Sequence, residues 1–258
     1  MNFKKGYSNV NGISMYYEIH GDGEPLVLVH GGGSTINTTF GEVIPMFAED
    51  FRVVAVELQA HGHTSDRDSP ESFEQDADDV ATLLDNLHIS KASFFGFSNG
   101  GSTVMQIANR HPEIVNKLII ASTFYKREGM IPGFFESMQQ ADINKLPKVL
   151  EQEFLKINPD FSKLLNMFNK DRERMLNFTD WKEEILSSIK APSLILSGDK
   201  DVVLAEHAVA MSKLISNSRL MILPSDHGSY IGVMESPNRD RSLVALTAHT
   251  IMNFLNQK

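Results

Sequence analysis

Residues 92–110 read ASFFGFSNGGSTVMQIANR, and this stretch decides the fold. Residues 92–97 are mostly apolar, as expected of a strand buried on both faces, and residues 99–110 have the apolar spacing of a helix. Between them, Gly96, Ser98 and Gly100 form a GxSxG pattern. A strand that enters this pattern and a helix that leaves it place Ser98 on a sharp turn, which glycines permit because they add no side chain to the tight backbone. The stretch therefore predicts a nucleophilic serine at the end of a buried strand.

The rest of the chain alternates short apolar runs with amphipathic stretches. Besides residues 92–97, the runs that predict strands are residues 13–20, 25–30, 51–57, 117–122, 193–197 and 219–223. Helical spacing predicts covering helices over residues 73–87 and 240–255. This alternation predicts an α/β fold with a mostly parallel sheet of about seven to eight strands and helices on both faces. The turn at Gly21-Asp22-Gly23 predicts that the first two strands pair antiparallel as a hairpin.

The alternation stops from about residue 124 to residue 190. This segment has no strand-like run, and it has helical patterns at residues 146–157 and 161–175. We therefore predict a core formed by residues 1–123 and 189–258, with a helical insertion at residues 124–188. Two roles are open for the methionines of the insertion, since they can fill a small core between helices or line a substrate cavity, and both can hold at once. These methionines are Met130, Met138, Met167 and Met175.

Composition excludes several classes of protein. The chain of 258 residues has no cysteine, so disulfides, thiolate metal sites and cysteine nucleophiles are excluded. Its formal net charge of −9 argues against the basic face of a nucleic-acid binder. No apolar run approaches the roughly 18 residues that span a bilayer, and residues 1–11 lack the apolar stretch of a signal peptide. We expect one cytoplasmic domain with no nucleic-acid or membrane partner.

A glycine run, Gly31-Gly32-Gly33, follows the predicted strand that ends at His30. Active sites of open α/β sheets form at this edge, where the strands end. Acyl transfer requires backbone N–H groups aimed at the developing oxyanion. We predict the backbone N–H groups of Gly32 and Asn99 as these donors. A plain glycine-rich turn is the alternative, and the position of Ser98 in the same sheet weakens it.

A serine hydroxyl needs a base to take its proton, and His227 is the predicted base. It follows the last predicted strand through a short loop, so it lies at the same edge as Ser98. The other histidines are predicted to tie loops together, to end a strand or to lie on helix surfaces and ends. The histidines predicted to tie loops together are His30, His61 and His63, and the one that ends a strand is His20. Those on helix surfaces or ends are His88, His111, His207 and His249.

The base needs a carboxylate on its other ring nitrogen. The segment Gly198-Asp199-Lys200-Asp201 follows a predicted strand and offers two candidates. We favour Asp201 over Asp199, because two further residues carry it out to the loop where it can meet His227. Asp226 adjoins His227 in sequence, which places it badly for the ring, so we predict that it braces the loop.

The order Ser98, Asp201, His227 resembles that of the α/β-hydrolase superfamily. Residues 57–64 are similar to that family's Asp-Leu-Arg-Gly-His-Gly-Arg-Ser segment, and the residues that match outright are Leu58, His61 and Gly62. The resemblance spans the whole chain. It implies that the helical insertion is a cap over the nucleophile that shapes substrate choice, as in small esterases and enol-lactonases.

Residues at particular positions argue against several families of this fold. Epoxide hydrolases and haloalkane dehalogenases have an aspartate nucleophile, where this chain has Ser98. Carbon–carbon bond hydrolases typically have tryptophan after the catalytic histidine, where this chain has Gly228. Prolyl aminopeptidases usually have GGSWG around the serine and a larger cap. The resemblance therefore implies hydrolysis of a carboxylic ester or lactone.

We expect a serine hydrolase that forms an acyl-enzyme on Ser98 with a small-molecule ester or lactone and requires no metal or organic cofactor. Two alternatives stay open. The same triad serves acyl transfer or perhydrolysis, and some proteins of this fold sense a ligand rather than turn it over. A homodimer is compatible with the sequence.

Overall fold

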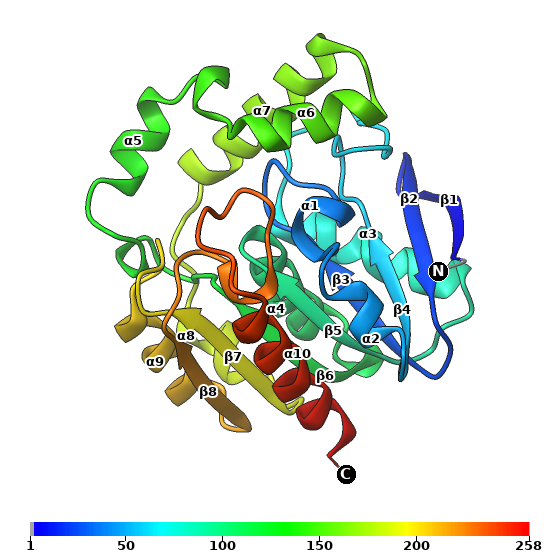
Figure 1. Ribbon diagram of the computed structural model, residues 1–258, viewed down its shortest axis with the longest axis vertical. Coiled ribbons are helices and arrows are strands. Elements are labelled where there is room, and N and C mark those ends of the chain that lie inside the picture. Colours follow the sequence, from blue (N-terminus) through cyan, green and yellow to red (C-terminus); the bar gives the residue numbers. More distant parts are fainter. Residues whose placement is uncertain (1–2, 258) are drawn as a thin grey trace.

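The computed structural model describes residues 3–257 and contains one mixed sheet (Figure 1). Its strand order is β1-β2-β4-β3-β5-β6-β7-β8. The strands from β4 to β8 in this order run parallel, whereas β2 is antiparallel to both β1 and β4. This confirms the predicted fold class. The strands are β1 (Lys4–Val10), β2 (Ile13–His20), β3 (Glu24–Val29), β4 (Phe51–Val56), β5 (Ala92–Phe97), β6 (Val115–Ala121), β7 (Ser193–Gly198) and β8 (Ser218–Leu223).

The predicted hairpin between the first two predicted strands is wrong. β2 pairs with β1 and β4, and β3 lies on the far side of β4. The hairpin partner of β2 is β1, through a turn at Asn11 and Gly12 whose φ angles are 42° and 90°. An Asn-Gly pair suits such a turn because both residues tolerate the left-handed region. β1 escaped prediction because it is a largely exposed edge strand with a polar sequence, KKGYSNV.

Helices cover both faces of the sheet, each over its own apolar core. On one face pack α3 (Phe73–Asn86), α4 (Asn99–Arg110), α8 (Glu183–Ser187) and α9 (Ala205–Leu214). On the other face pack α1 (Ile36–Phe40), α2 (Ile44–Phe47) and α10 (Arg241–Asn256). β5 lies between the two cores with every residue buried, so the turn that carries Ser98 starts from a fully buried strand.

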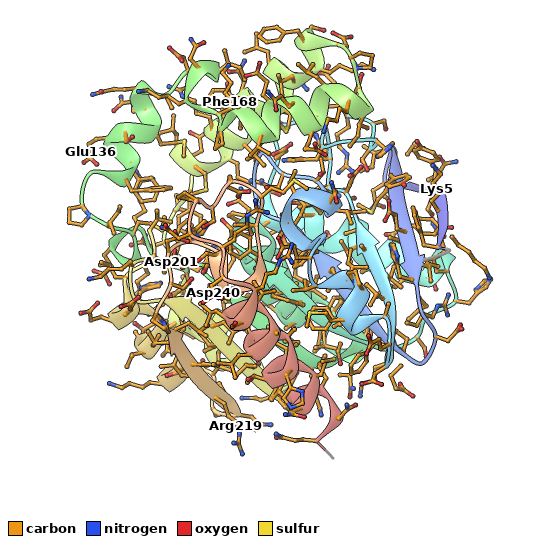
Figure 2. All side chains as sticks on the ribbon, in the orientation of Figure 1. Lys5, Glu136, Phe168, Asp201, Arg219 and Asp240 are labelled. Atoms are coloured by element: carbon orange, nitrogen blue, oxygen red, sulfur yellow. The ribbon has the colours of Figure 1, made fainter. Side chains whose placement is uncertain are left out.

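The segment between β6 and β7 is helical. It contains α5 (Phe134–Gln140), α6 (Lys148–Ile157) and α7 (Phe161–Leu176), which gather beyond one edge of the sheet (Figure 1). Figure 2 places Glu136 and Phe168 on these helices, with Asp201 on the sheet side below them. α6 and α7 share a small core that includes Leu150, Phe154 and Met167. We refer to α5, α6 and α7 as the inserted helices.

The last helix of the segment, α8, behaves differently from the inserted helices. It contacts α4 and α9, and its Leu186 is fully buried in the core on that face of the sheet. The proposed boundary at residue 188 stays a prediction. Short 3₁₀ helices occur at Pro112–Ile114, Arg127–Gly129, Ile143–Lys145 and Ser229–Ile231. Within residues 3–257, every helix is too short or too polar to span a lipid bilayer.

Candidate active site

Ser98 lies between β5 and α4 in an unusual backbone conformation. Its φ is 55° and its ψ is −122°, outside the regions that a serine normally adopts. The two flanking glycines make this turn sterically feasible. A Cβ at Gly96 would lie 2.0 Å from the carbonyl oxygen of Gly100, and a Cβ at Gly100 would lie 2.0 Å from that of Val29. The turn therefore holds Ser98 at the C-terminal edge of the sheet, as the sequence pattern predicts.

Three side chains meet at this edge in a single hydrogen-bonded chain. Nε2 of His227 lies 3.1 Å from Oγ of Ser98, and Nδ1 of His227 lies 2.6 Å from Oδ1 of Asp201. Because a carboxylate can only accept, Nδ1–H donates to Asp201 and Nε2 is left to accept from the serine hydroxyl. Burial opposes charging of the ring, but the charge and hydrogen bond of Asp201 outweigh it and raise the pKa of His227.

Asp201 is itself held by several donors. Its Oδ2 accepts hydrogen bonds from the hydroxyl of Ser122 and from the backbone N–H of Gly198, and its Oδ1 accepts from the N–H of Val203 at 3.2 Å. The hydroxyl of Tyr230 lies 2.6 Å from that of Ser122. Burial favours the neutral acid, yet His227 and these donors hold the pKa of Asp201 below its usual value.

Sequence reasoning missed Ser122 and Tyr230. The available signal was position, because Ser122 comes directly after β6 at the edge of the sheet where the site forms.

The two other acids of these loops lie away from the ring of His227. Oδ1 of Asp199 accepts from the backbone N–H of Ser225 at 2.9 Å, which ties the loop after β7 to the loop after β8. Asp226 accepts from the side chains of Ser236 and Asn238. Both acids brace loops, which is the role that the sequence analysis predicts for Asp226.

Gly32 and Asn99 face each other beside Ser98. A Cβ at Gly32 would lie 2.5 Å from Nδ2 of Asn99, so a larger residue there would have to displace that amide group. Among residues 3–257, neither backbone N–H has a protein acceptor. Asn99 is also the first residue of α4, where the helix dipole favours negative charge. The arrangement can receive an oxyanion.

A carboxylate that the sequence analysis did not single out, Asp171, comes from α7 and lines the cavity that also contains Ser98 and His227. Its Oδ2 accepts from the backbone N–H of Gly33 at 2.6 Å and from Nε2–H of His61 at 2.9 Å. Its Oδ1 accepts from Nδ2 of Asn99 at 3.3 Å and pairs with Arg174. Nothing in an amphipathic helix marks one acid as a partner for a loop 138 residues away.

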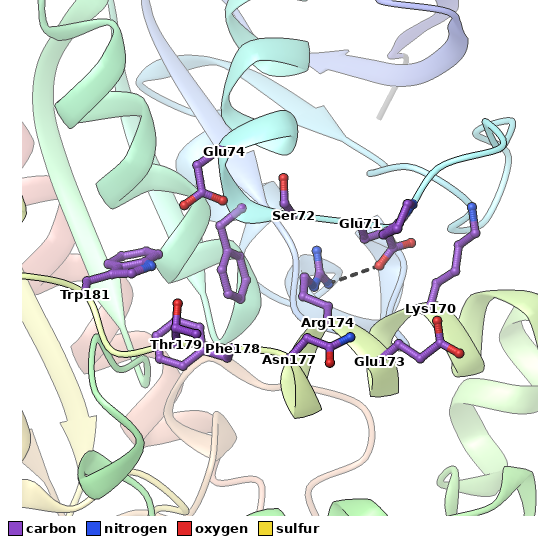
Figure 3. Close-up of a pocket in the computed structure, with 12 residues that line it drawn as sticks. Glu71, Ser72, Glu74, Lys170, Glu173, Arg174, Asn177, Phe178, Thr179 and Trp181 are labelled. Carbon is purple, nitrogen blue, oxygen red and sulfur yellow. Dashed lines mark ion pairs between the residues drawn. The ribbon is translucent and has the colours of Figure 1, made fainter.

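Asp171 belongs to a buried cluster of charges. Arg174 pairs with Asp171 and Asp76, and it lies 3.5 Å from Glu71 at a second cavity of about 250 Å³, which has both polar and apolar walls (Figure 3). Both carboxyl oxygens of Glu71 lack a hydrogen-bond partner among residues 3–257, and burial raises its pKa. Burial also raises the pKa of Asp76, to about 6. Despite burial, the charge and hydrogen bond of Asp171 raise the pKa of His61 to about 9.

The remaining loop histidines tie backbone segments together. His30 is fully buried, with Nδ1 2.7 Å from the carbonyl oxygen of Gly31 and Nε2 accepting from the N–H of Leu58. His63 pairs with Glu57.

The prediction that His207 lies on a solvated helix face is wrong. Its ring is buried, stacks on Tyr125 and accepts from that residue's backbone N–H, and burial lowers its pKa to about 4. The apolar contact outweighed the general preference of histidine for surfaces.

A cavity of about 550 Å³ opens over Ser98 and His227, between the sheet edge and the inserted helices. Its walls are mostly apolar, and the methionines divide between the two predicted roles. Met130, Met138 and Met175 line the cavity, whereas Met167 is buried between α6 and α7. One polar exception is Glu235, whose Oε2 is buried without a hydrogen-bond partner among the described residues.

A model of the alpha/beta hydrolase fold family matches residues 24–165, which is more than half of the chain. The chain belongs to the α/β-hydrolase family. Within residues 3–257 of this α/β-hydrolase, no group of three or more His, Asp or Glu side chains is arranged to hold a metal ion.

Several of the relatives that it matches are named as hydrolases. It is 28% identical over 228 residues to the serine hydrolase BPHL of Homo sapiens, covering 83% of this chain and 77% of that protein. It is 24% identical over 255 residues to a 2-hydroxy-6-oxo-6-(2'-aminophenyl)hexa-2,4-dienoic acid hydrolase of Metapseudomonas resinovorans, covering 90% of this chain and 86% of that one. The crystal structure of the enol-lactonase from Burkholderia xenovorans LB400 has a TM-score of 0.77 at 22% identity, over 97% of this chain and 100% of that one, and so shares the fold.

Proposed function

We propose that this α/β-hydrolase cleaves a small carboxylic ester or lactone through an acyl-enzyme on Ser98. The observation that carries the proposal is the chain Ser98–His227–Asp201 at the floor of a mostly apolar cavity of about 550 Å³. A cavity of this size and lining suits a small, largely apolar substrate.

In the first half-reaction, Oγ of Ser98 attacks the carbonyl carbon while Nε2 of His227 takes its proton. The carbonyl oxygen becomes an oxyanion and accepts hydrogen bonds from the backbone N–H groups of Gly32 and Asn99. When the tetrahedral intermediate collapses, the carbon–oxygen bond to the alcohol breaks and His227 gives its proton to the leaving oxygen. Asp201 stabilises the imidazolium in between and does not itself take the proton.

In the second half-reaction, a water molecule gives a proton to Nε2 of His227 and attacks the acyl carbon. Collapse of the second intermediate returns the proton to Oγ of Ser98 and releases the acid. With a lactone, the alcohol and the acid leave as one hydroxy acid. Every step uses groups of the chain and one water.

The experiment is a screen of the purified protein against p-nitrophenyl esters of increasing acyl length, a set of lactones, and thioesters, with Ser98→Ala as the matched control. We expect ester or lactone turnover by the native protein and none above background by Ser98→Ala. A fluorophosphonate should label Ser98, and labelling of Ser225 or Ser229 instead would contradict the assignment. Turnover that survives in Ser98→Ala would also overturn it.

Three other outcomes identify the alternatives. Ester or peracid products formed when alcohol or hydrogen peroxide is added would mean that a nucleophile other than water takes the acyl group. Cleavage of a dienoic acid substrate without ester turnover would mean carbon–carbon bond hydrolysis. A ligand-induced change in the protease sensitivity of the inserted helices without any turnover would mean a sensor.

A further inference from the structure

The carboxylate of Asp171 bridges the two segments that carry the proposed oxyanion donors. Through Oδ2 it accepts from the N–H of Gly33, the residue after Gly32, and through Oδ1 it accepts from the side chain of Asn99. A Cβ at Gly32 would lie 3.2 Å from both carboxyl oxygens, so the carboxylate packs directly on that glycine. One buried side chain of α7 therefore touches both sides of the candidate oxyanion site.

The glycine loop needs an anchor from elsewhere. Gly31, Gly32 and Gly33 have no side chains to restrict their backbone angles, and Gly33 already adopts a φ of 66°. In a flexible loop, the N–H of Gly32 would point in many different directions. The backbone N–H of Gly33 donates a hydrogen bond of 2.6 Å to Asp171. Hydrogen bonds to a charged acceptor are stronger than those to a neutral acceptor.

An anion beside a developing oxyanion would oppose catalysis unless its charge were compensated. His61 and Arg174 supply that compensation. The ring of His61 donates to Asp171 through Nε2–H and is oriented by a contact of 2.8 Å between Nδ1 and the carbonyl oxygen of Gln59. Burial favours the neutral acid, but His61 and Arg174 overcome it and hold the pKa of Asp171 well below its usual value. The carboxylate can thus serve as a hydrogen-bond anchor without presenting a free negative charge to the substrate.

We propose that Asp171 is a positioning residue that fixes the glycine loop and Asn99, so that the N–H groups of Gly32 and Asn99 converge on one oxygen. The inference rests on the proposed function, since the oxyanion forms only if Ser98 attacks a carbonyl. It makes the inserted helices part of the catalytic apparatus: α7 sets the geometry of the oxyanion site as well as covering the cavity.

The first test needs no substrate. Hydrogen exchange of the Gly33 amide is compared in the native protein, Asp171→Ala and Asp160→Ala. Asp160 is exposed and caps α7 by accepting from the N–H of Ser162, so its loss destabilises the same helix without touching the loop. We expect exchange at Gly33 about tenfold faster in Asp171→Ala and unchanged in Asp160→Ala. Equal exchange at Gly33 in all three proteins would overturn the proposal.

The second test separates positioning from binding and from stability. At a temperature where each variant is folded, Asp171→Ala should lower kcat on the order of 10²-fold with KM nearly unchanged, because the donors act on the transition state. Asp171→Asn, which keeps one acceptor oxygen, should lose less, and Asp160→Ala should keep the native kcat. A rise in KM alone would make Asp171 a substrate-binding residue, and a drop in melting temperature alone would make it structural. Either result would overturn the proposal.

The two proposals fail in different ways. If no ester or lactone is turned over by the native protein, the proposed function fails even when Gly33 exchange depends on Asp171. If Ser98-dependent turnover is present but kcat is the same in Asp171→Ala, the positioning role fails and the proposed function stands.

Discussion

Nδ1 of His227 lies 2.6 Å from Oδ1 of Asp201, whereas Asp199, two residues earlier, accepts from the backbone of Ser225. Both acids follow the same strand, β7, and they have different partners. Asp201 fixes the tautomer of His227 that leaves Nε2 free to accept the serine proton. Asp199 joins two loops.

This division predicts unequal effects of two matched substitutions. Asp201→Asn should lower kcat by about 10⁴-fold, because the amide can hold the ring in the wrong tautomer. Asp199→Asn should keep most of kcat and lower the melting temperature, since it weakens a loop contact. Steady-state kinetics with the best ester of the screen, together with thermal unfolding, measures both. The roles must be exchanged if Asp199→Asn costs more kcat in a folded protein.

The pH dependence of kcat/KM should report His227. The base works only when neutral, so activity should be low in acid and rise as the pH passes the pKa of His227. Because Asp201 outweighs burial and raises that pKa, the midpoint should lie above the usual value of about 6.5. Asp201→Asn removes the largest influences that raise this pKa and leaves burial opposed only by the smaller effects of Glu235 and Asp226, so the midpoint of the residual activity should move to lower pH. A midpoint that stays at the native value in Asp201→Asn would contradict this account of the electrostatics.

The tight turn around Ser98 predicts a difference between two glycines. A Cβ at Gly100 would lie 2.0 Å from a backbone carbonyl oxygen. Nothing lies within 4 Å of a Cβ at Gly133, which directly precedes α5 and has a φ of 83°. Gly133→Ala should cost only the strain of its backbone angle, about 1 kcal/mol of unfolding free energy. Gly100→Ala must displace β3 or α4, so it should cost about 3 kcal/mol or more, or yield insoluble protein. Urea unfolding of the two variants compares them directly, and equal losses would mean that the turn can relax.

How far the sequence could predict this site depends on how locally each part is encoded. Ser98 is set by a strand, two glycines and a helix within adjacent residues, so its place could be predicted. His227 and Asp201 follow strands, and parallel strands bring the residues after them to one edge. Asp171 had no such signal, because its partner Gly33 is 138 residues away and only the packing of α7 brings them together.

The misread elements have similar physical causes. β1 is stabilised by pairing with β2 rather than by apolar burial, so its sequence lacks the pattern of a strand. Gly21 allows the chain to pass close to the backbone at Ala48 as it crosses from β2 to β3. From the sequence alone, the same glycine is interpreted as part of a hairpin turn. His207 is buried by contact with Tyr125, which is distant in sequence.

The hydroxyl groups of Ser122 and Tyr230 form a chain behind Asp201. Tyr230 is fully buried, and its hydroxyl can donate to Ser122, which in turn donates to Asp201. Ser122→Ala removes a donor from Asp201 and leaves the hydroxyl of Tyr230 without its partner. The cost should be about 1–3 kcal/mol of unfolding free energy, which urea unfolding measures. kcat should also fall, because Asp201 is held less firmly against His227.

A double variant separates the two effects. Ser122→Ala with Tyr230→Phe removes both hydroxyls, so no orphaned polar group stays buried, and part of the lost stability should return. The loss of kcat should persist, because Asp201 still lacks the donor from Ser122. The hydroxyl chain would have no part in holding Asp201 if kcat were native in both variants. A stability loss in the double variant equal to the sum of the losses in Ser122→Ala and Tyr230→Phe would show that the two hydroxyls do not depend on each other.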